Sequence, residues 1–98
     1  MYPGGLSRRP RLASFARVRP DRVTGGWMLL FPERGLMLNP SARAIVGLCT
    51  GEHTIAAIVD RLTLEHTGAV RAAVQSDVVA VLEALAARGL IRFDESAG

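Results

Sequence analysis

The stretch from Trp27 to Leu38, with the sequence WMLLFPERGLML, decides the fold. Two apolar runs of strand length, residues 27–31 and 35–39, flank a turn that holds a proline and a charged pair. This arrangement predicts a β-hairpin. Neither run alternates apolar with polar residues, although a small antiparallel sheet normally exposes one face to water. The hairpin is therefore expected to carry apolar side chains on both faces.

The chain before the hairpin is basic and contains several turn signals. Leu12, Phe15 and Val18 lie among polar residues, which predicts a weak first strand or extended segment over residues 12–19. With the hairpin, this segment would complete a three-stranded antiparallel sheet. Residues 1–11 combine proline, glycine and arginine with little apolar content, so we expect a mobile basic arm there.

Three helices are predicted after the hairpin. Asn39 before Pro40 indicates an N-cap and a helix over residues 40–48. Thr54 is a second N-cap candidate, because the residues after it follow the i, i+3, i+4, i+7 spacing of an amphipathic helix that ends near His66. A longer helix is predicted over residues 70–88, with a core stripe of Val74, Val78, Val81, Leu82 and Leu85.

The end of the chain completes the predicted architecture. Residues 90–93 indicate a short terminal strand or an extended tail that packs on the core, and residues 94–98 are expected to fray. Strands followed by three helices are typical of an α+β domain of the winged helix-turn-helix type. The 98 residues are enough for one domain, residues 1–98, with one modest core.

Composition restricts the class of protein. The net charge is +3, every cation is an arginine, and six of the twelve arginines precede residue 23. A single cysteine, Cys49, excludes an internal disulfide and fits a reducing cytoplasm. No apolar run is long enough to span a membrane, and no secretory signal is visible. We therefore expect a cytoplasmic protein without a membrane partner.

The sequence offers few groups for catalysis. His53 and His66 lie on different predicted elements, without cysteines or carboxylates at metal-ligand spacing. Cys49 has no base near it in the sequence and is expected to be a small buried residue. Glycine-rich phosphate loops are missing. We therefore expect a binding protein that is not an enzyme and needs no metal or cofactor.

A DNA-binding regulator is the first alternative, because winged helices often place their third helix in the major groove. The exposed face of the helix over residues 70–88 carries Arg71 before its C-terminal Arg88, together with Asp77, which would face phosphate. Affinity for DNA needs several neutralising contacts. The pattern therefore disfavours nucleic acid as the partner.

Residues 17–93 resemble a known family. The run Gly35-Leu36-Met37-Leu38-Asn39-Pro40-Ser41-Ala42, followed by Leu48-Cys49-Thr50-Gly51, Thr54-Ile55, Asp77-Val78 and Gly89-Leu90-Ile91, is similar to PqqD, the pyrroloquinoline quinone (PQQ) biosynthesis protein D. Thr50 departs from the pattern, since the family usually has an acidic residue at that loop position.

The resemblance implies a peptide-recognition module for a ribosomally made, modified peptide (RiPP). Such a protein binds the leader of the precursor peptide PqqA and presents it to the radical S-adenosylmethionine enzyme PqqE, without catalysis of its own. The leader is expected to add as an extra strand beside the last hairpin strand, against the third helix. Leader binding in another modified-peptide pathway and pairing of the hairpin with a second copy of the chain, as a homodimer, stay open as alternatives.

The strand-addition mode indicates which residues would form the peptide site, because a free strand edge offers main-chain donors and acceptors while side chains supply selectivity. Arg71 could pair with an acidic leader residue. Val79 points away from the core stripe and is a better groove candidate than Val78. The candidate peptide-binding residues are Gly35, Leu36, Met37, Leu38, Asn39, Val70, Arg71, Val74, Gln75, Val78 and Val79.

Overall fold

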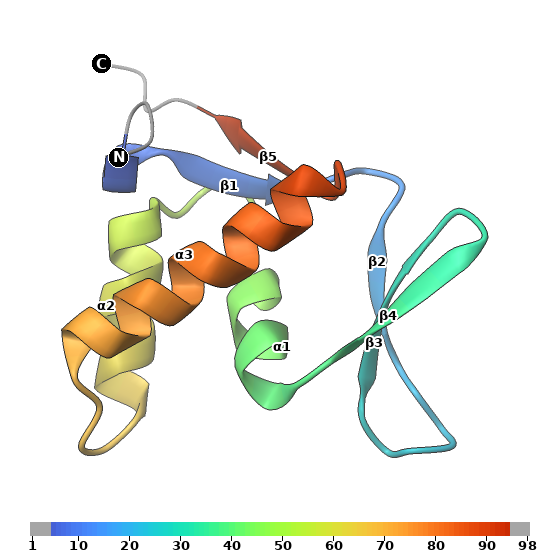
Figure 1. Ribbon diagram of the computed structural model, residues 1–98, viewed down its shortest axis with the longest axis horizontal. Helices are drawn as coiled ribbons and strands as arrows, with labels where there is room; N and C mark the ends of the chain where they lie inside the picture. The colour runs from blue at the N-terminus through green and yellow to red at the C-terminus, as the bar shows by residue number, and fades with distance from the viewer. Residues whose placement is uncertain (1–4, 95–98) are drawn as a thin grey trace.

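The computed structural model describes residues 5–94, in which two small antiparallel sheets and three helices share one core (Figure 1). The α+β class and the three-stranded sheet followed by three helices are confirmed. The winged helix-turn-helix designation stays a prediction. In chain order the elements are η1 (Gly5–Ser7), β1 (Arg9–Leu12), β2 (Arg17–Pro20), β3 (Trp27–Phe31), β4 (Arg34–Leu38), α1 (Pro40–Gly47), α2 (Ile55–Glu65), α3 (Arg71–Ala87) and β5 (Ile91–Asp94).

The predicted hairpin is present, and its turn is shorter than the sequence suggested. Phe31 pairs with Arg34, so only Pro32 and Glu33 form the turn. Glu33 has a φ of 62°, in the left-handed region. Proline followed by a positive φ is the geometry of a type II turn. The register then runs without a bulge to the pair of Trp27 with Leu38.

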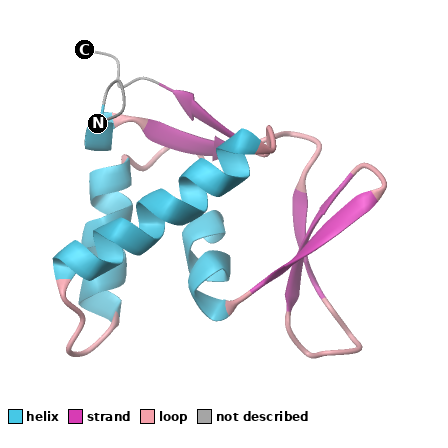
Figure 2. Cartoon of the chain, in the orientation of Figure 1, coloured by secondary structure: helices cyan, strands magenta, loops and turns pink. Residues whose placement is uncertain are grey.

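β2 completes the sheet in the order β2-β3-β4, but the predicted first strand was placed too early. It spans Arg17–Pro20, whereas Leu12 ends a different strand. The chain turns between them, where the Ala13 N–H donates to the Leu90 carbonyl and the Ala16 N–H donates to the Ala13 carbonyl. Figure 2 shows this sheet on one side of the molecule, joined to the helices through α1.

The loop between β2 and β3 is closed by side-chain hydrogen bonds. Asp21 accepts a 2.6 Å bond from the Thr24 hydroxyl and a 3.2 Å bond from the Val23 N–H. The bond from Thr24 has the largest effect and the bond from Val23 the next largest, and both lower the pKa of the Asp21 carboxyl from its ordinary value. Gly25 follows with a φ of 78°, which an L-residue rarely adopts. Gly25 and Gly26 therefore lie in the turn that joins β2 to β3.

The prediction of a mobile arm over residues 1–11 is wrong for residues 5–11. β1 pairs with β5 in antiparallel register, from Arg9 with Asp94 to Leu12 with Ile91. The other edge of β1 is also bonded. The Ile55 N–H donates to the Arg8 carbonyl at 2.9 Å, the Gly51 N–H to the Pro10 carbonyl at 3.0 Å, and the Leu12 N–H to the Cys49 carbonyl at 2.9 Å. Residues 1–4 lie outside the described residues.

The predicted terminal strand is confirmed at Ile91–Asp94, one residue later than expected. Asp94, assigned to the frayed tail 94–98, instead ends β5 and forms a 2.9 Å ion pair with Arg11. Residues 95–98 of that tail are outside the described range.

The helices form largely as their caps predicted. The Asn39 side chain accepts from the Ala42 N–H at 2.7 Å, and the Thr54 hydroxyl accepts from the Ala57 N–H at 3.1 Å. α3 begins at Arg71, and its N-cap residue Val70 makes no side-chain cap hydrogen bond. Its buried residues are Val78, Leu82 and Leu85, while Val74 and Val81 of the predicted stripe are half-buried. Within residues 5–94, no helix combines the length and the apolar character needed to cross a membrane.

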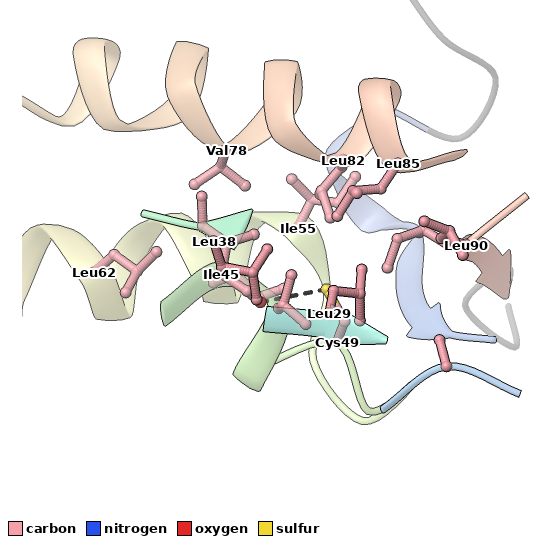
Figure 3. Packing of buried hydrophobic residues seen from close by; sticks show 14 of the residues in the cluster. Leu29, Leu38, Ile45, Cys49, Ile55, Leu62, Val78, Leu82, Leu85 and Leu90 are labelled. Carbon is pink, nitrogen blue, oxygen red and sulfur yellow. Dashed lines mark hydrogen bonds between the residues drawn. The ribbon is translucent and has the colours of Figure 1, made fainter. Parts of the chain in front are cut away.

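One core joins both sheets to the helices. Leu29 of β3 and Leu38 of β4 pack with Ile45 of α1 and with the buried face of α3 (Figure 3). Leu90, before β5, closes the core near the C-terminal end of α3. The three-stranded sheet is therefore held to the helices through its inner face and through the direct junction of β4 with α1.

Removal of residues 1–11 should lower the free energy of unfolding by about 3 kcal/mol or more. It removes the carbonyls of Arg8 and Pro10, which accept hydrogen bonds, and most of the pairing of β1 with β5. At least three backbone hydrogen bonds are lost in this way, at ~1 kcal/mol each. Urea denaturation of the shortened and complete chains measures this. Arg11→Ala is the matched control. It removes only an exposed ion pair and should cost less than ~1 kcal/mol. Equal stability of the shortened and complete chains would restore the mobile-arm interpretation.

Glu33→Gly should raise the free energy of unfolding by about 1 kcal/mol, because glycine adopts a positive φ without the steric penalty of an L-residue. Glu33→Val should lower it, since a β-branched residue tolerates that φ poorly. Thermal unfolding of the two variants beside the parent protein checks both signs. The turn geometry is wrong if valine is tolerated as well as glycine.

Candidate functional site

The backbone of β4 has one edge without a strand partner among the described residues, since the sheet order ends at β4. In an antiparallel ladder, facing residues alternate between pairs that exchange hydrogen bonds and pairs that do not. The two-residue turn makes Phe31 with Arg34 a bonded pair, so the bonded positions of β4 are Arg34, Leu36 and Leu38. The N–H and C=O groups of Gly35 and Met37 therefore point outward, along the free edge.

β2 forms the opposite edge of the same sheet, and its outward positions differ. Its register with β3 makes Arg17 and Arg19 the bonded positions, which leaves Val18 and Pro20 pointing outward. Proline has no N–H to offer to another strand, and prolines commonly protect exposed edges. Of the two edges, only that of β4 presents a main-chain donor at both outward residues.

The side chains of β4 divide between the two faces of the sheet. Leu38 is buried and Leu36 half-buried, both toward the helices. Met37 is 53% exposed on the other face. Gly35 lies on that face beneath Met28 and Leu30, where an added Cβ would come within 2.8 Å of the Met28 methyl carbon. The two apolar faces predicted for the hairpin are thus a core face and a solvent face.

α3 contributes residues with unlike surroundings. Val78 is 1% exposed and belongs to the core, in the same cluster as Leu38. Val74 is half-buried beside it. Gln75 and Val79 line a shallow hollow on α3. Val70 is 65% exposed at the start of the helix. Val79 is half-buried and therefore more accessible than Val78, and its choice as the better groove candidate stays a prediction.

A pocket of about 210 Å³ lies between α1, the end of α2 and the first half of α3. Val74 and Val78 are the predicted site residues that reach it. Its walls are mainly apolar, with polar groups from Ser41, His66 and Asp77. The sequence analysis placed Asp77 on the exposed face of the third helix and His66 near the end of the second, and it named neither of them, nor Ser41, as a site residue. No local pattern links these residues, because they meet only through helix packing.

Arg71 already has partners in the free protein. Its guanidinium contacts the Asp60 carboxylate at 2.8 Å and donates to the Gln75 side-chain oxygen at 3.1 Å. Both charged side chains are about half exposed, so this ion pair contributes little stability. An acidic ligand group would have to compete with Asp60 for the same donor.

The predicted residues therefore form three groups. The core unites Leu38 with Val78, and Leu36, Val74 and Val79 pack against it. Met37 and the open side of Gly35 lie on the far face of the sheet, away from the face that packs on the helices. The remaining four lie at the starts of helices: Asn39, which caps α1, and Val70, Arg71 and Gln75.

Catalytic groups do not converge in the described part of the chain. Residues 5–94 contain no cluster of three or more histidine, cysteine, aspartate or glutamate side chains that could hold a metal ion. His66 follows α2, where its Nδ1 lies 2.8 Å from the Leu62 carbonyl. Cys49 is buried just after α1 and donates to the Ile45 carbonyl at 3.3 Å. Burial raises the pKa of the Cys49 thiol to about 12, which suppresses the nucleophilic thiolate.

The Cys49 thiol of the native protein should react with a disulfide reagent at pH 8 roughly 1,000-fold more slowly than in the urea-unfolded chain, given a pKa near 12 instead of 9.0. The same shift makes stability pH-dependent. The raised folded pKa contributes stability that is complete below pH 9.0 and is lost as the pH rises toward 12. Rapid labelling of the native state would contradict this assignment.

Sequence relatives share most of the length of the chain. Residues 26–91 match the family described as coenzyme PQQ synthesis protein D (PqqD). A PqqA binding protein of Rhodopseudomonas palustris (strain HaA2) is 41% identical over 83 residues, which cover 85% of this chain and 80% of the relative. A PqqA binding protein of Bradyrhizobium diazoefficiens is 34% identical over the same shares.

Solved structures share the fold. The solution structure of the PqqD truncation of Methylobacterium extorquens PqqCD, described as a functional, stand-alone RiPP recognition element, matches with a TM-score of 0.72 and 31% identity, over 85% of this chain and 87% of that one. Lasso peptide synthetase B1 complexed with the leader peptide also matches with a TM-score of 0.72, over 86% and 98% of the two chains. Its identity is 24%, so it bears on the fold alone.

Proposed function

The chain belongs to the PqqD family, and from that membership we propose that it binds the leader of the precursor peptide PqqA and presents it to the radical enzyme PqqE. The role is recognition, without catalysis, in PQQ biosynthesis in the cytoplasm. The family relation supports this role over that of a DNA-binding regulator. The free edge of β4 is the structural observation that supports the proposal.

Strand addition to β4 supplies the proposed main-chain contacts. Gly35 and Met37 each offer one N–H and one C=O, so an extended peptide can form up to four backbone hydrogen bonds. At ~1 kcal/mol each these give about 4 kcal/mol. Micromolar affinity corresponds to about 8 kcal/mol. Burial of apolar leader side chains must therefore contribute a comparable amount, beyond the cost of ordering the peptide.

α3 and the pocket beside it are the proposed source of that apolar contribution. A guest strand points alternate side chains to the face on which Leu36 and Leu38 lie, which is the face that the helices cover. Val74 and the pocket between α1 and α3 offer apolar surface there. Arg71 is proposed to exchange Asp60 for an acidic leader residue, which would make that contact sensitive to salt.

Titration of the isotope-labelled protein with a PqqA leader peptide should shift the amide signals of residues 35–39 and 70–79. The amide of Val18, on the opposite edge of the sheet, is the internal reference and should move little. If residues 35–39 and 70–79 remain unperturbed at saturation, the proposed peptide site is wrong. A leader from another modified-peptide pathway that binds more tightly would reassign the pathway and leave the site in place.

Met37→Pro should weaken leader binding by at least about tenfold, because proline removes an outward N–H from the free edge and leaves the bonds between β3 and β4 intact. Met37→Ala is the matched control, since it changes the side chain and keeps the N–H. Fluorescence anisotropy of a labelled leader gives both affinities. Equal losses in the two variants would mean that the side chain, not the backbone edge, binds the peptide.

A further inference from the structure

The solvent-facing side of the three-stranded sheet forms a continuous surface of mixed character, here called the outer face. The register places five side chains together on it: Arg17 opposite Leu30, Arg19 opposite Met28, and Met37 opposite Met28 on the other flank. Successive residues of a strand point to opposite faces, so these five lie opposite the core-facing Val18, Leu29 and Leu36.

The apolar part of the outer face is outside the core. Met28, Leu30 and Met37 neither belong to the buried cluster of the described residues nor pack against it. Met37 is 53% exposed. Met28 and Leu30 are half-buried, and the ends of both side chains lie over Gly35. Methionine is adaptable in shape and is enriched, with arginine, at the centres of protein interfaces.

The charged part of the outer face has one sign. Arg17 and Arg19 are exposed, and neither forms an ion pair within residues 5–94. No carboxylate occupies a paired strand position on this face, because its other paired positions are methionine, leucine and glycine. The surface therefore combines an apolar centre with an unpaired cationic border.

We infer that the outer face docks a second protein whose apolar surface is bordered by carboxylates, and that this protein is the enzyme that receives the bound peptide. The inference rests on the proposed function. Charge complementarity selects this occupant over a second copy of the chain. The paired strand positions of two outer faces brought together would contribute four arginines and no carboxylate, and like charges in an interface disfavour association.

The geometry lets the enzyme and the peptide bind at once. A leader strand on the edge of β4 extends the sheet sideways and leaves the outer face uncovered. Because side chains alternate along a strand, every second residue of the leader would join the outer face beside Met37. The enzyme would then contact the recognition protein and the outward side chains of its peptide on one surface.

The test compares the double variant Arg17→Glu/Arg19→Glu with the matched control Arg61→Glu/Arg92→Glu, which makes the same change of net charge on α2 and β5. Purified PqqE is the probe, with affinity measured by calorimetry for the complete chain. The outer-face variant should bind PqqE about tenfold or more weakly, and the control should bind like the parent protein. Leader affinity should change less than about twofold in both.

A second variant addresses the apolar centre. Met28→Gln keeps the length of the side chain and should also weaken PqqE binding while the leader affinity is retained. Unchanged PqqE affinity in the outer-face variants, or an equal loss in the control, would overturn the inference. So would a homodimer in sedimentation that the outer-face variants dissociate. If the parent protein itself does not bind the leader, the proposed function is refuted instead. Failure of the docking inference and failure of the proposed function are therefore distinguishable.

Discussion

The two-residue turn at Pro32 and Glu33 is the constraint on which the rest of the sheet depends. A hairpin closed by two residues has a single register, and a shift of one residue would exchange the two faces of β4. The turn thereby places Leu38 in the core and Met37 on the solvent side. It also sets which backbone groups bond to β3 and which remain free.

A single strand can therefore serve three purposes without conflict. The inward side chains of β4 join the core, which holds the sheet to α1 and α3 (Figure 3). Its free N–H and C=O groups lie in the plane of the sheet, and its outward side chains lie on the opposite face. Since the two sets of side chains point in opposite directions and the backbone groups point roughly perpendicular to both, a substitution that affects one of the three need not disturb the others. The apolar character of both faces in the sequence reflects this division, because one face packs on the core and the other is the outer face proposed to dock a second protein.

Local signals predicted the fold where the determinants were local. The N-caps Asn39 and Thr54 and the helical spacing after them gave helix boundaries close to those observed. β1 was missed because its partner lies about 80 residues away and its own sequence, with Arg9 and Pro10, has no strand pattern. The apolar character of both faces of β4 was predicted from its sequence, whereas the outward position of Pro20 depends on the register between β2 and β3. The pocket lined by Asp77 is formed by helix packing, which no short motif encodes.

The unequal edges of the sheet have a consequence for the behaviour of the protein at high concentration. If both edges could donate, β2 of one molecule could join β4 of the next, and this head-to-tail contact would repeat into an open filament. Pro20 removes a donor from one half of that contact. Head-to-tail pairing of the two edges therefore lacks one main-chain donor, which disfavours growth of such a filament and leaves the β4 edge open for the proposed guest strand.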